Sequence, residues 1–256
     1  MSFVEYVALG DSMSIDLYPA LDVGETDVAV ALERDPSAGR VAPLGAASLL
    51  YRNDEGRWPD EVGEDLLSRY PGIAFRNFAA DAATIGDVFG GQLPDLTPTD
   101  EPTLVTLTVG THDLLSPLAN RPRRATLEAI ARDVANAYDA LVDAIRAARP
   151  ASLLLLTTVC DPSDRTGLIP GVLPEAGRLP LTALDTLNAH IRALAARADH
   201  VALADAYLHF LGHGTTASDD DRWFWRRSLL EPNARGANAL RHVWLDALDR
   251  VEQTRR

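Results

Sequence analysis

The sequence has 256 residues, of which 46% are hydrophobic and 24% charged, a balance that is typical of a folded globular protein rather than a disordered one. Its formal net charge of −13 opposes binding to the phosphate backbone of nucleic acids, which requires clustered cations. No apolar stretch approaches the roughly 20 residues of a membrane helix, so we expect no membrane span.

The only cysteine, Cys160, cannot form a disulfide within the chain, which is typical of a reducing compartment. The first residues contain no basic region followed by an apolar core, so we expect no secretory signal and a cytoplasmic location. No linker or internal repeat divides the chain, and we expect one domain over residues 1–256. The oligomeric state is left open by the sequence.

Five short apolar runs, rich in β-branched residues and leucine, alternate with longer amphipathic or irregular segments. The runs cover residues 3–9, 73–79, 104–109, 152–159 and 201–206. Each has the length of a strand that is buried on both faces. The pattern predicts a three-layer α/β/α sandwich around a flavodoxin-like, five-stranded parallel sheet.

Helical periodicity is strongest at residues 123–148, where apolar side chains recur every three or four positions and Pro150 ends the pattern. A second helix is expected at residues 181–198. A third is expected to begin near Pro232, as a proline in a first helical turn, and to continue past Leu248.

Two long irregular stretches, residues 16–59 and 209–231, are of the kind that usually carries function. The first either forms a lid or contains the first covering helix near residues 45–51. In an open α/β sheet, ligands bind beyond the carboxyl ends of the strands. The residues that follow each apolar run are therefore the candidates for a functional site.

Gly10-Asp11-Ser12 follows the first run, at the turn into the next segment. A serine at this position would present its hydroxyl at the edge of the sheet, and the glycine would allow a sharp turn. The alternative interpretation is a helix cap, because Asp and Ser are common capping residues. The Gly-x-Ser-x-Gly elbow of ordinary α/β-hydrolases is absent from the sequence.

Two further segments follow the second and third runs: Asn-Phe-Ala-Ala-Asp-Ala-Ala-Thr at residues 77–84 and Gly-Thr-His-Asp at residues 110–113. Together with residues 7–12, and in this order, they resemble the SGNH (GDSL) hydrolase family, whose four blocks supply Ser, Gly, Asn and His. The resemblance spans nearly the whole chain. It implies the fold predicted above and an esterase or lipase-like activity.

The chain departs from the family pattern at three blocks. Ala82 stands where the family has its oxyanion glycine, and His112 replaces the asparagine of the third block. The last block, Asp-x-x-His-Pro in the family, is Ser-Leu-Leu-Glu-Pro at residues 228–232, so Glu231 occupies the position of the catalytic histidine. The resemblance implies Ser12 as nucleophile, with an oxyanion hole formed by the N–H groups of Ser12 and Ala82 and the His112 side chain.

A different group must then take the proton from Ser12. Our leading hypothesis is that His213, in Leu-Gly-His-Gly after the fifth run, is the base and that the Glu231 carboxylate orients it. His209 is a weaker candidate, and His112 is a third. Glu231 itself is a fourth candidate, if burial raises its pKa.

Other features after the strands have more ordinary interpretations. Asp161 and Asp164 follow the fourth run in a sequence that favours a turn over a pocket wall. The aromatic residues 223–225 would either pack a long loop or line an acyl pocket. No spacing typical of a metal site and no phosphate-binding loop is present, so we expect no metal and no cofactor.

Two functions remain open at this point. The first is a serine esterase or lipase-like hydrolase that acts on a small-molecule carboxylic ester with a small or medium acyl group. The second is a catalytically impaired protein of the same fold, which binds a ligand or partner without turnover. Reaction of Ser12 with an acyl or phosphonate probe would distinguish them.

Overall fold

The computed structural model describes residues 2–24, 44–117, 124–170, 178–179 and 181–254. Its centre is a five-stranded sheet in the order β2-β1-β3-β4-β5, in which all neighbouring strands are parallel. The strands are β1 (Glu5–Gly10), β2 (Ala74–Asn77), β3 (Thr103–Thr108), β4 (Ser152–Thr157) and β5 (Val201–Ala204). All five coincide with apolar runs of the sequence, so the predicted α/β/α sandwich is confirmed.

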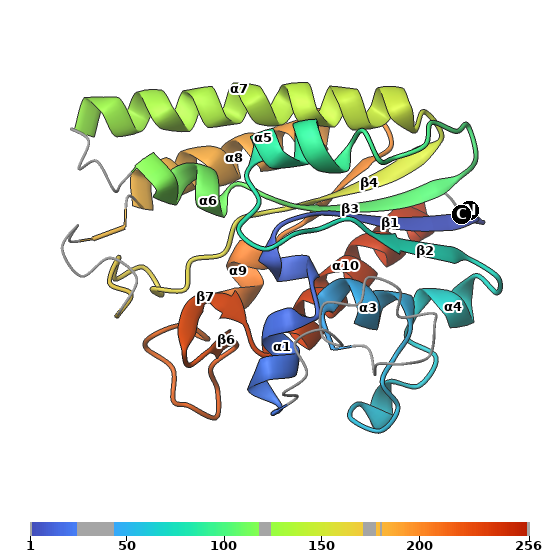
Figure 1. Cartoon of the computed structure of the whole chain (residues 1–256), viewed down its shortest axis with the longest axis horizontal. Helices are drawn as coiled ribbons and strands as arrows, with labels where there is room; N and C mark the ends of the chain where they lie inside the picture. The colour runs from blue at the N-terminus through green and yellow to red at the C-terminus, as the bar shows by residue number, and fades with distance from the viewer. Residues whose placement is uncertain (1, 25–43, 118–123, 171–177, 180, 255–256) are drawn as a thin grey trace.

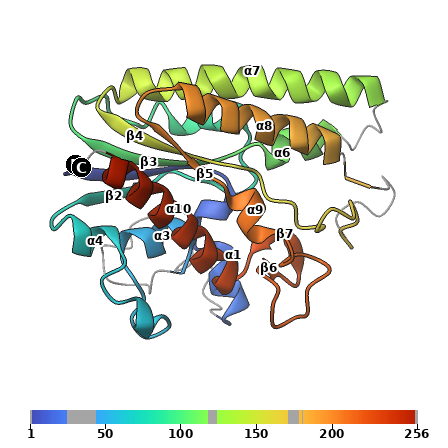
Figure 2. The same cartoon turned by 180° about the vertical axis from the view of Figure 1, so that it is seen from behind.

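Helices cover both faces of this sheet (Figures 1 and 2). One face carries α5 (Ile85–Asp87), α7 (Arg124–Ala148) and α8 (Leu181–Arg197), and the other carries α3 (Ala46–Tyr51), α4 (Leu66–Arg69) and α10 (Ala234–Thr254). Successive strand residues point to opposite faces, and the apolar side chains of β1, β3 and β4 divide between two buried clusters accordingly. This two-sided burial explains why the strands are continuous apolar runs.

The remaining elements lie at or near the carboxyl ends of the strands or in their connections. They are η1 (Ser12–Ser14), α1 (Leu17–Asp22), η3 (Pro59–Glu61), η4 (Val88–Gln92), α6 (Thr111–Leu115), α9 (Ala206–Phe210), β6 (Phe224–Trp225) and β7 (Ser228–Pro232). β6 and β7 pair antiparallel to form a hairpin that lies beside α1 in both views (Figures 1 and 2).

The long helices agree with the predictions, with one correction at the start of α10. Pro232 is the last residue of β7 rather than a first-turn proline, and Asn233 caps the helix by accepting a hydrogen bond from the Gly236 N–H at 2.8 Å. In the first irregular stretch, α3 confirms the covering helix. Residues 25–43 of that stretch lie outside the described residues, so a lid there stays untested.

The buried face of α10 carries a charged residue. Arg241 is fully buried, donates to Asn53 Oδ1 at 2.7 Å and forms an ion pair with Glu61 of η3. Glu61 also accepts from Asn238 at 3.1 Å, and its carboxylate lies 3.2 Å from His242 Nε2. These contacts join α10 to the segment between α3 and α4. No described helix is both long and apolar enough to cross a membrane.

Candidate active site

Ser12 is the first residue of η1, directly beyond the carboxyl end of β1, and its side chain is buried. The chain reaches it through Gly10, whose φ of +124° and close approach to the Thr108 carbonyl leave no room for a side chain. The Gln92 side chain bonds both the N–H and the C=O of Gly10 at 2.8 Å. Because Ser12 begins a helical turn, its own N–H has no partner within that turn.

Asp11 caps η1 by accepting the Met13 N–H at 3.2 Å. The cap interpretation and the nucleophile interpretation of this segment are therefore compatible, because the capping residue is Asp11 and not Ser12. Burial raises the pKa of Asp11 to about 7, and the nearby Glu231 carboxylate adds to the rise.

Glu231 lies in β7 and is 5% exposed. The Ser12 side chain lies close enough to the Glu231 carboxyl to lower that carboxyl's pKa, so the position that holds the family's histidine does face the serine. The Glu231 Oε2 atom is buried without a hydrogen-bond partner among the described residues. Burial raises the pKa of Glu231 to about 7, with a further contribution from the negative charge of Asp81, while the nearby Ser12 side chain opposes the rise.

Ala82 adopts a left-handed backbone conformation with φ of +55°, in the turn between β2 and α5. This conformation favours glycine, which is the residue that the family has at this position. The Ala82 N–H forms no hydrogen bond to another described residue, so it remains available as a donor. Its role in an oxyanion hole stays a prediction.

His112 lies in the first turn of α6 and is partly buried. Burial lowers the pKa of His112, whereas the nearby Asp81 carboxylate raises it. The lowering by burial dominates, so the neutral ring, which donates from one nitrogen and accepts at the other, is favoured. Its role as an oxyanion donor stays a prediction.

The His213 side chain contacts Asp221 and Trp223. Its Nδ1 atom lies 2.8 Å from the Asp221 carbonyl oxygen, and its ring stacks on Trp223 with centroids 3.5 Å apart and planes within 2°. Among the described residues, these contacts do not include Ser12 or Glu231. The structure therefore brings no support for the expected His213–Glu231 pair, which stays a prediction. That His213 acts as the base stays a prediction without a supporting contact.

His209 belongs to the same histidine loop, which we define as residues 209–223. Its ring contacts Trp223 with centroids 5.1 Å apart, and the charges nearest to it are Asp246, His213 and His242. Burial lowers the pKa of His209, and the two other histidines lower it further. None of these groups belongs to the Ser12 site.

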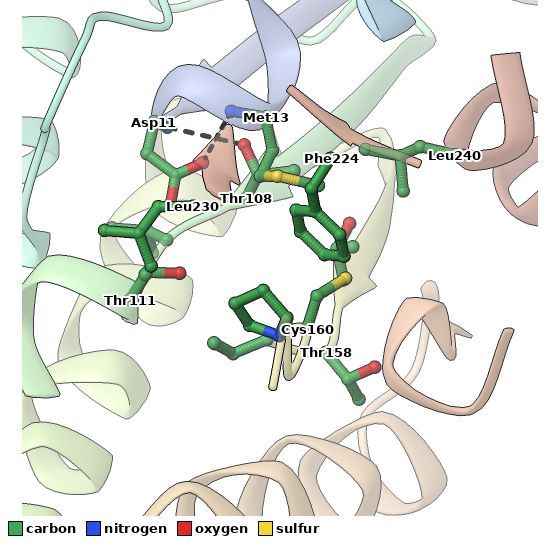
Figure 3. Close-up of a pocket in the computed structure, with 13 residues that line it drawn as sticks. Asp11, Met13, Thr108, Thr111, Thr158, Cys160, Phe224, Leu230 and Leu240 are labelled. Carbon is green, nitrogen blue, oxygen red and sulfur yellow. Dashed lines mark hydrogen bonds between the residues drawn. The ribbon is translucent and has the colours of Figure 1, made fainter. Parts of the chain in front are cut away.

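An apolar pocket lies beside the Ser12–Glu231 pair. One hollow is lined by Asp11 and Met13, which flank Ser12, and by Leu230, which precedes Glu231. Figure 3 shows Met13, Phe224, Leu230 and Cys160 gathered around it. A second hollow, lined by leucines of α6 and α8, adjoins the first. The two share Thr111, Val159, Cys160, Pro162 and Leu230.

The sequence left open the roles of the aromatic residues 223–225 and of Asp161, and the structure places both. Phe224 lines the apolar pocket, so one of the three clustered aromatic residues contributes to the pocket wall. Asp161 instead closes a turn, since its carboxylate accepts the Ser163 N–H and the Arg165 N–H, both at 2.9 Å. Burial holds the pKa of Cys160 well above its usual value, which leaves the thiol protonated.

Two residues near Glu231 had no signal in the sequence. Tyr18 of α1 donates a hydrogen bond to Asp81 at 2.9 Å, and both residues lie close enough to Glu231 to interact with its charge. In the sequence, Asp81 is marked only by its place before Ala82, and Tyr18 lies in the first irregular stretch, where no pattern indicates a role for it. Within the described residues, no group of three or more His, Cys, Asp or Glu side chains is arranged to hold a metal ion.

The fold is similar to several solved hydrolases. Phospholipase A1 from Streptomyces albidoflavus NA297 matches with a TM-score of 0.60 and 21% identity, covering 97% of this chain and 99% of that one. An extracellular lipase from Streptomyces rimosus matches with a TM-score of 0.55 and 21% identity over 95% and 99% of the two chains. A variant of an acetyl xylan esterase from Geobacillus stearothermophilus reaches a TM-score of 0.60 at 14% identity, over 96% and 94%.

A comparison with curated proteins found no match. The family model of the GDSL-like lipase/acylhydrolases matches residues 37–239, which include Ala82, His112 and Glu231. Ser12 precedes the matched segment, and its place in the site follows from the fold. The match covers most of the chain and agrees with the α/β/α architecture and with the order of the strand-end segments. This chain belongs to the GDSL-like lipase/acylhydrolase family.

Proposed function

We propose that this chain is a serine hydrolase that cleaves small-molecule carboxylic esters with an apolar acyl group, using Ser12 as nucleophile and Glu231 as base. The observation that carries the proposal is that the buried Ser12 side chain and the buried Glu231 carboxyl face each other closely enough for Ser12 to lower the pKa of Glu231. A carboxylate is ordinarily too weak a base for a serine hydroxyl. Glu231, with a pKa raised to about 7, has the proton affinity of an ordinary histidine.

In the first half of the reaction, the Ser12 hydroxyl proton passes to Glu231 while Oγ bonds to the ester carbonyl carbon. The tetrahedral intermediate then breaks its bond to the alcohol oxygen, which takes the proton from Glu231 as it leaves. In the second half, a water gives a proton to Glu231 and attacks the acyl carbon. Ser12 leaves with that proton, and the products are a carboxylic acid and an alcohol.

The negative charge on the carbonyl oxygen requires donors that are in place before the reaction. The N–H groups of Ser12 and Ala82 and the His112 ring are the candidates. The Ser12 N–H, which has no hydrogen-bond partner among the described residues, and the left-handed turn at Ala82 support the two backbone donors. The neutral ring favoured at His112 keeps one N–H, which supports a side-chain donor at this position.

The apolar pocket supports the choice of acyl group. Its two hollows are lined mainly by apolar side chains, and the first is flanked by the neighbours of both Ser12 and Glu231. An alkyl chain bound there would be removed from water, which stabilises the complex by about 0.8 kcal/mol per buried methylene. A cytoplasmic location remains an expectation, for which the single cysteine is the support.

The test is covalent labelling by a fluorophosphonate probe, with wild type beside Ser12→Ala, Glu231→Gln and His213→Ala. We expect labelling of wild type and of His213→Ala at similar rates, none of Ser12→Ala, and a rate reduced by roughly 10³-fold or more in Glu231→Gln. Circular dichroism checks that each variant is folded. Labelling lost in His213→Ala but kept in Glu231→Gln would return the base to the histidine loop. An unlabelled wild type would favour a binding protein.

A second measurement tests the acyl group. Wild type and Cys160→Phe are compared on p-nitrophenyl acetate and octanoate, because the new ring would fill the junction of the two hollows. We expect kcat/KM for octanoate to fall by roughly 10- to 100-fold, with acetate little changed. Equal losses on both esters would place the acyl chain elsewhere.

A further inference from the structure

The helix α1 is held at both ends, which fixes the position of Tyr18 within it. Before the helix, the Asp16 carboxylate accepts hydrogen bonds from Leu44 N–H at 2.9 Å and from the Ser48 hydroxyl at 2.7 Å. At the other end, Asp22, the last residue of α1, accepts the Ala234 N–H at 3.4 Å, at the start of α10. A six-residue helix has little stability of its own, so these anchors are what hold it in place.

Tyr18 contacts two loops that come from distant parts of the sequence. Its hydroxyl donates to Asp81, directly before the left-handed Ala82. Its ring packs against Trp225 with centroids 5.6 Å apart and planes at 48°. Trp225 pairs with Ser228 in the β6–β7 hairpin, which carries Glu231 (Figure 1). One side chain therefore joins the loop of a candidate oxyanion donor to the hairpin of the candidate base.

We propose that Tyr18 and Asp81 form a positioning pair that holds the Ala82 turn and the Glu231 hairpin in register around Ser12. The proposal rests on the proposed function for its consequence in catalysis, but the pair itself is defined by the hydrogen bond and the ring contact. Neither residue needs to touch the ester. Both act through the groups that do.

The negative charge of Asp81 in this pair also affects the pKa of Glu231. The charged or titratable groups that face Glu231 are Asp11 from the end of β1, Tyr18 from α1 and Asp81 from the turn after β2. Asp81 raises the pKa of Glu231, and Tyr18 holds the Asp81 side chain in place. Asp81 thus helps to keep the Glu231 carboxylate basic enough to accept a proton from Ser12.

Two substitutions separate the bond from the charge. Tyr18→Phe keeps the ring against Trp225 but removes the bond to Asp81, whereas Asp81→Asn keeps an acceptor oxygen for Tyr18 but removes the charge. Tyr70→Phe is a matched control, because Tyr70 donates a similar bond to Glu252 near the C-terminal end of α10. Asp95→Asn removes an equal charge from an exposed position lining the same open cleft as Asp81.

We expect Tyr18→Phe to lower kcat by roughly tenfold with KM little changed, because the groups it positions act mainly in the transition state. Tyr18→Ala, which also loses the ring contact, should lower kcat further. In Asp81→Asn, the acid limb of the pH–rate profile should move to lower pH. Tyr70→Phe and Asp95→Asn should change neither quantity. Equal small losses in Tyr18→Phe and Tyr70→Phe would overturn the positioning role.

A measurement without turnover keeps this proposal separate from the proposed function. The Glu231 carboxyl is titrated by ¹³C NMR in glutamate-labelled protein, with Glu231→Gln identifying its resonance. We expect the midpoint to be lower in Asp81→Asn than in wild type and unchanged in Asp95→Asn. An unmoved midpoint in Asp81→Asn contradicts the charge coupling, whether or not the enzyme labels with fluorophosphonate. A moved midpoint in a protein that does not label supports the pair while the hydrolase proposal fails.

Discussion

The histidine loop and the β6–β7 hairpin follow one another in the chain, but they differ in how fully their polar groups are hydrogen-bonded. In the loop, the N–H groups of Gly212, Gly214 and Thr216 donate to the Asp164 carboxylate at 2.9, 3.0 and 3.0 Å, and Asp164 itself lies in the turn after β4. In the hairpin, a buried Glu231 oxygen has no partner among the described residues. The first arrangement is satisfied, and the second is energetically unfavourable.

This difference separates a structural role from a functional one. Buried polar groups are normally hydrogen-bonded, and an unpaired buried carboxylate costs folding free energy. A cost of this kind is found where a reaction needs a group with unusual proton affinity. The comparison therefore supports the proposed chemical role of the hairpin and favours a structural role for the histidine loop, and both have measurable consequences.

The largest expected effect is on the pH dependence of the rate. The base must be a carboxylate to accept the Ser12 proton, so kcat/KM should fall as pH drops through about 7, by tenfold for each further unit. A histidine would titrate in the same range, but carboxylic acids ionise with a much smaller enthalpy than imidazolium. The midpoint should therefore hardly move with temperature. A midpoint that shifts strongly, or that changes in His213→Ala, would assign the base to the loop.

The second-largest expected effect is an increase in the free energy of unfolding when Glu231, the proposed base, is replaced. The pKa of Glu231 is raised from 4.5 to about 7 by folding, so its charge destabilises the fold above pH 7, and this cost vanishes below about pH 4.5. Glu231→Gln should raise the free energy of unfolding by roughly 2–3 kcal/mol at pH 8 and by much less at pH 4.5. Urea denaturation at both pH values measures this, and destabilisation at pH 8 would contradict it.

The loop should show the reverse pattern. Asp164→Asn removes the charge that four donors share, including the Thr216 hydroxyl, and should cost about 1–3 kcal/mol of stability. Activity per folded molecule should stay within about twofold, since none of these groups contacts the site. Thermal denaturation and fluorophosphonate titration of active sites give the two values. A large loss of labelling in stable protein would bring the loop back into the mechanism.

The smallest effect concerns Ala82. A non-glycine residue with φ of +55° is strained by about 1 kcal/mol, while glycine makes the unfolded chain more flexible. Ala82→Gly, which restores the family's residue, should therefore raise the free energy of unfolding by only about 0.5 kcal/mol. Ala83→Gly is the matched control, since Ala83 has no positive φ and should be destabilised. Equal destabilisation in both would remove the argument for a left-handed turn.

The sheet and the main helices could be predicted from the sequence because burial on two faces leaves continuous apolar runs. The family pattern also placed Glu231 in the slot of the base, which the contact with Ser12 supports. The expectation for His213, which lies between Gly212 and Gly214, has no support from its contacts. A side chain at Gly214 would lie 2.3 Å from the Pro162 carbonyl oxygen. Glycine is required there by packing.

Tyr18 could not have been found in the same way. Its importance depends on which loops fold against α1, and no periodicity or spacing encodes that contact. The pKa of Glu231 was likewise open, because the desolvation that raises it arises only when the hairpin closes over Ser12. Sequence patterns specify elements well, whereas the environment of a single carboxyl is a property of the assembled fold.

The buried Arg241 has a consequence for the order in which the molecule is made. Its partners Asn53 and Glu61 lie early in the chain, and the Asn53 contact spans 188 residues. A guanidinium cannot be buried before those partners are in place, so α10 docks only onto an existing layer. β7 leads directly into α10, which makes docking of Glu231 against Ser12 a late event in folding. During synthesis, Ser12 is made long before Glu231, so the pair that we propose as nucleophile and base can form only after β7 has emerged.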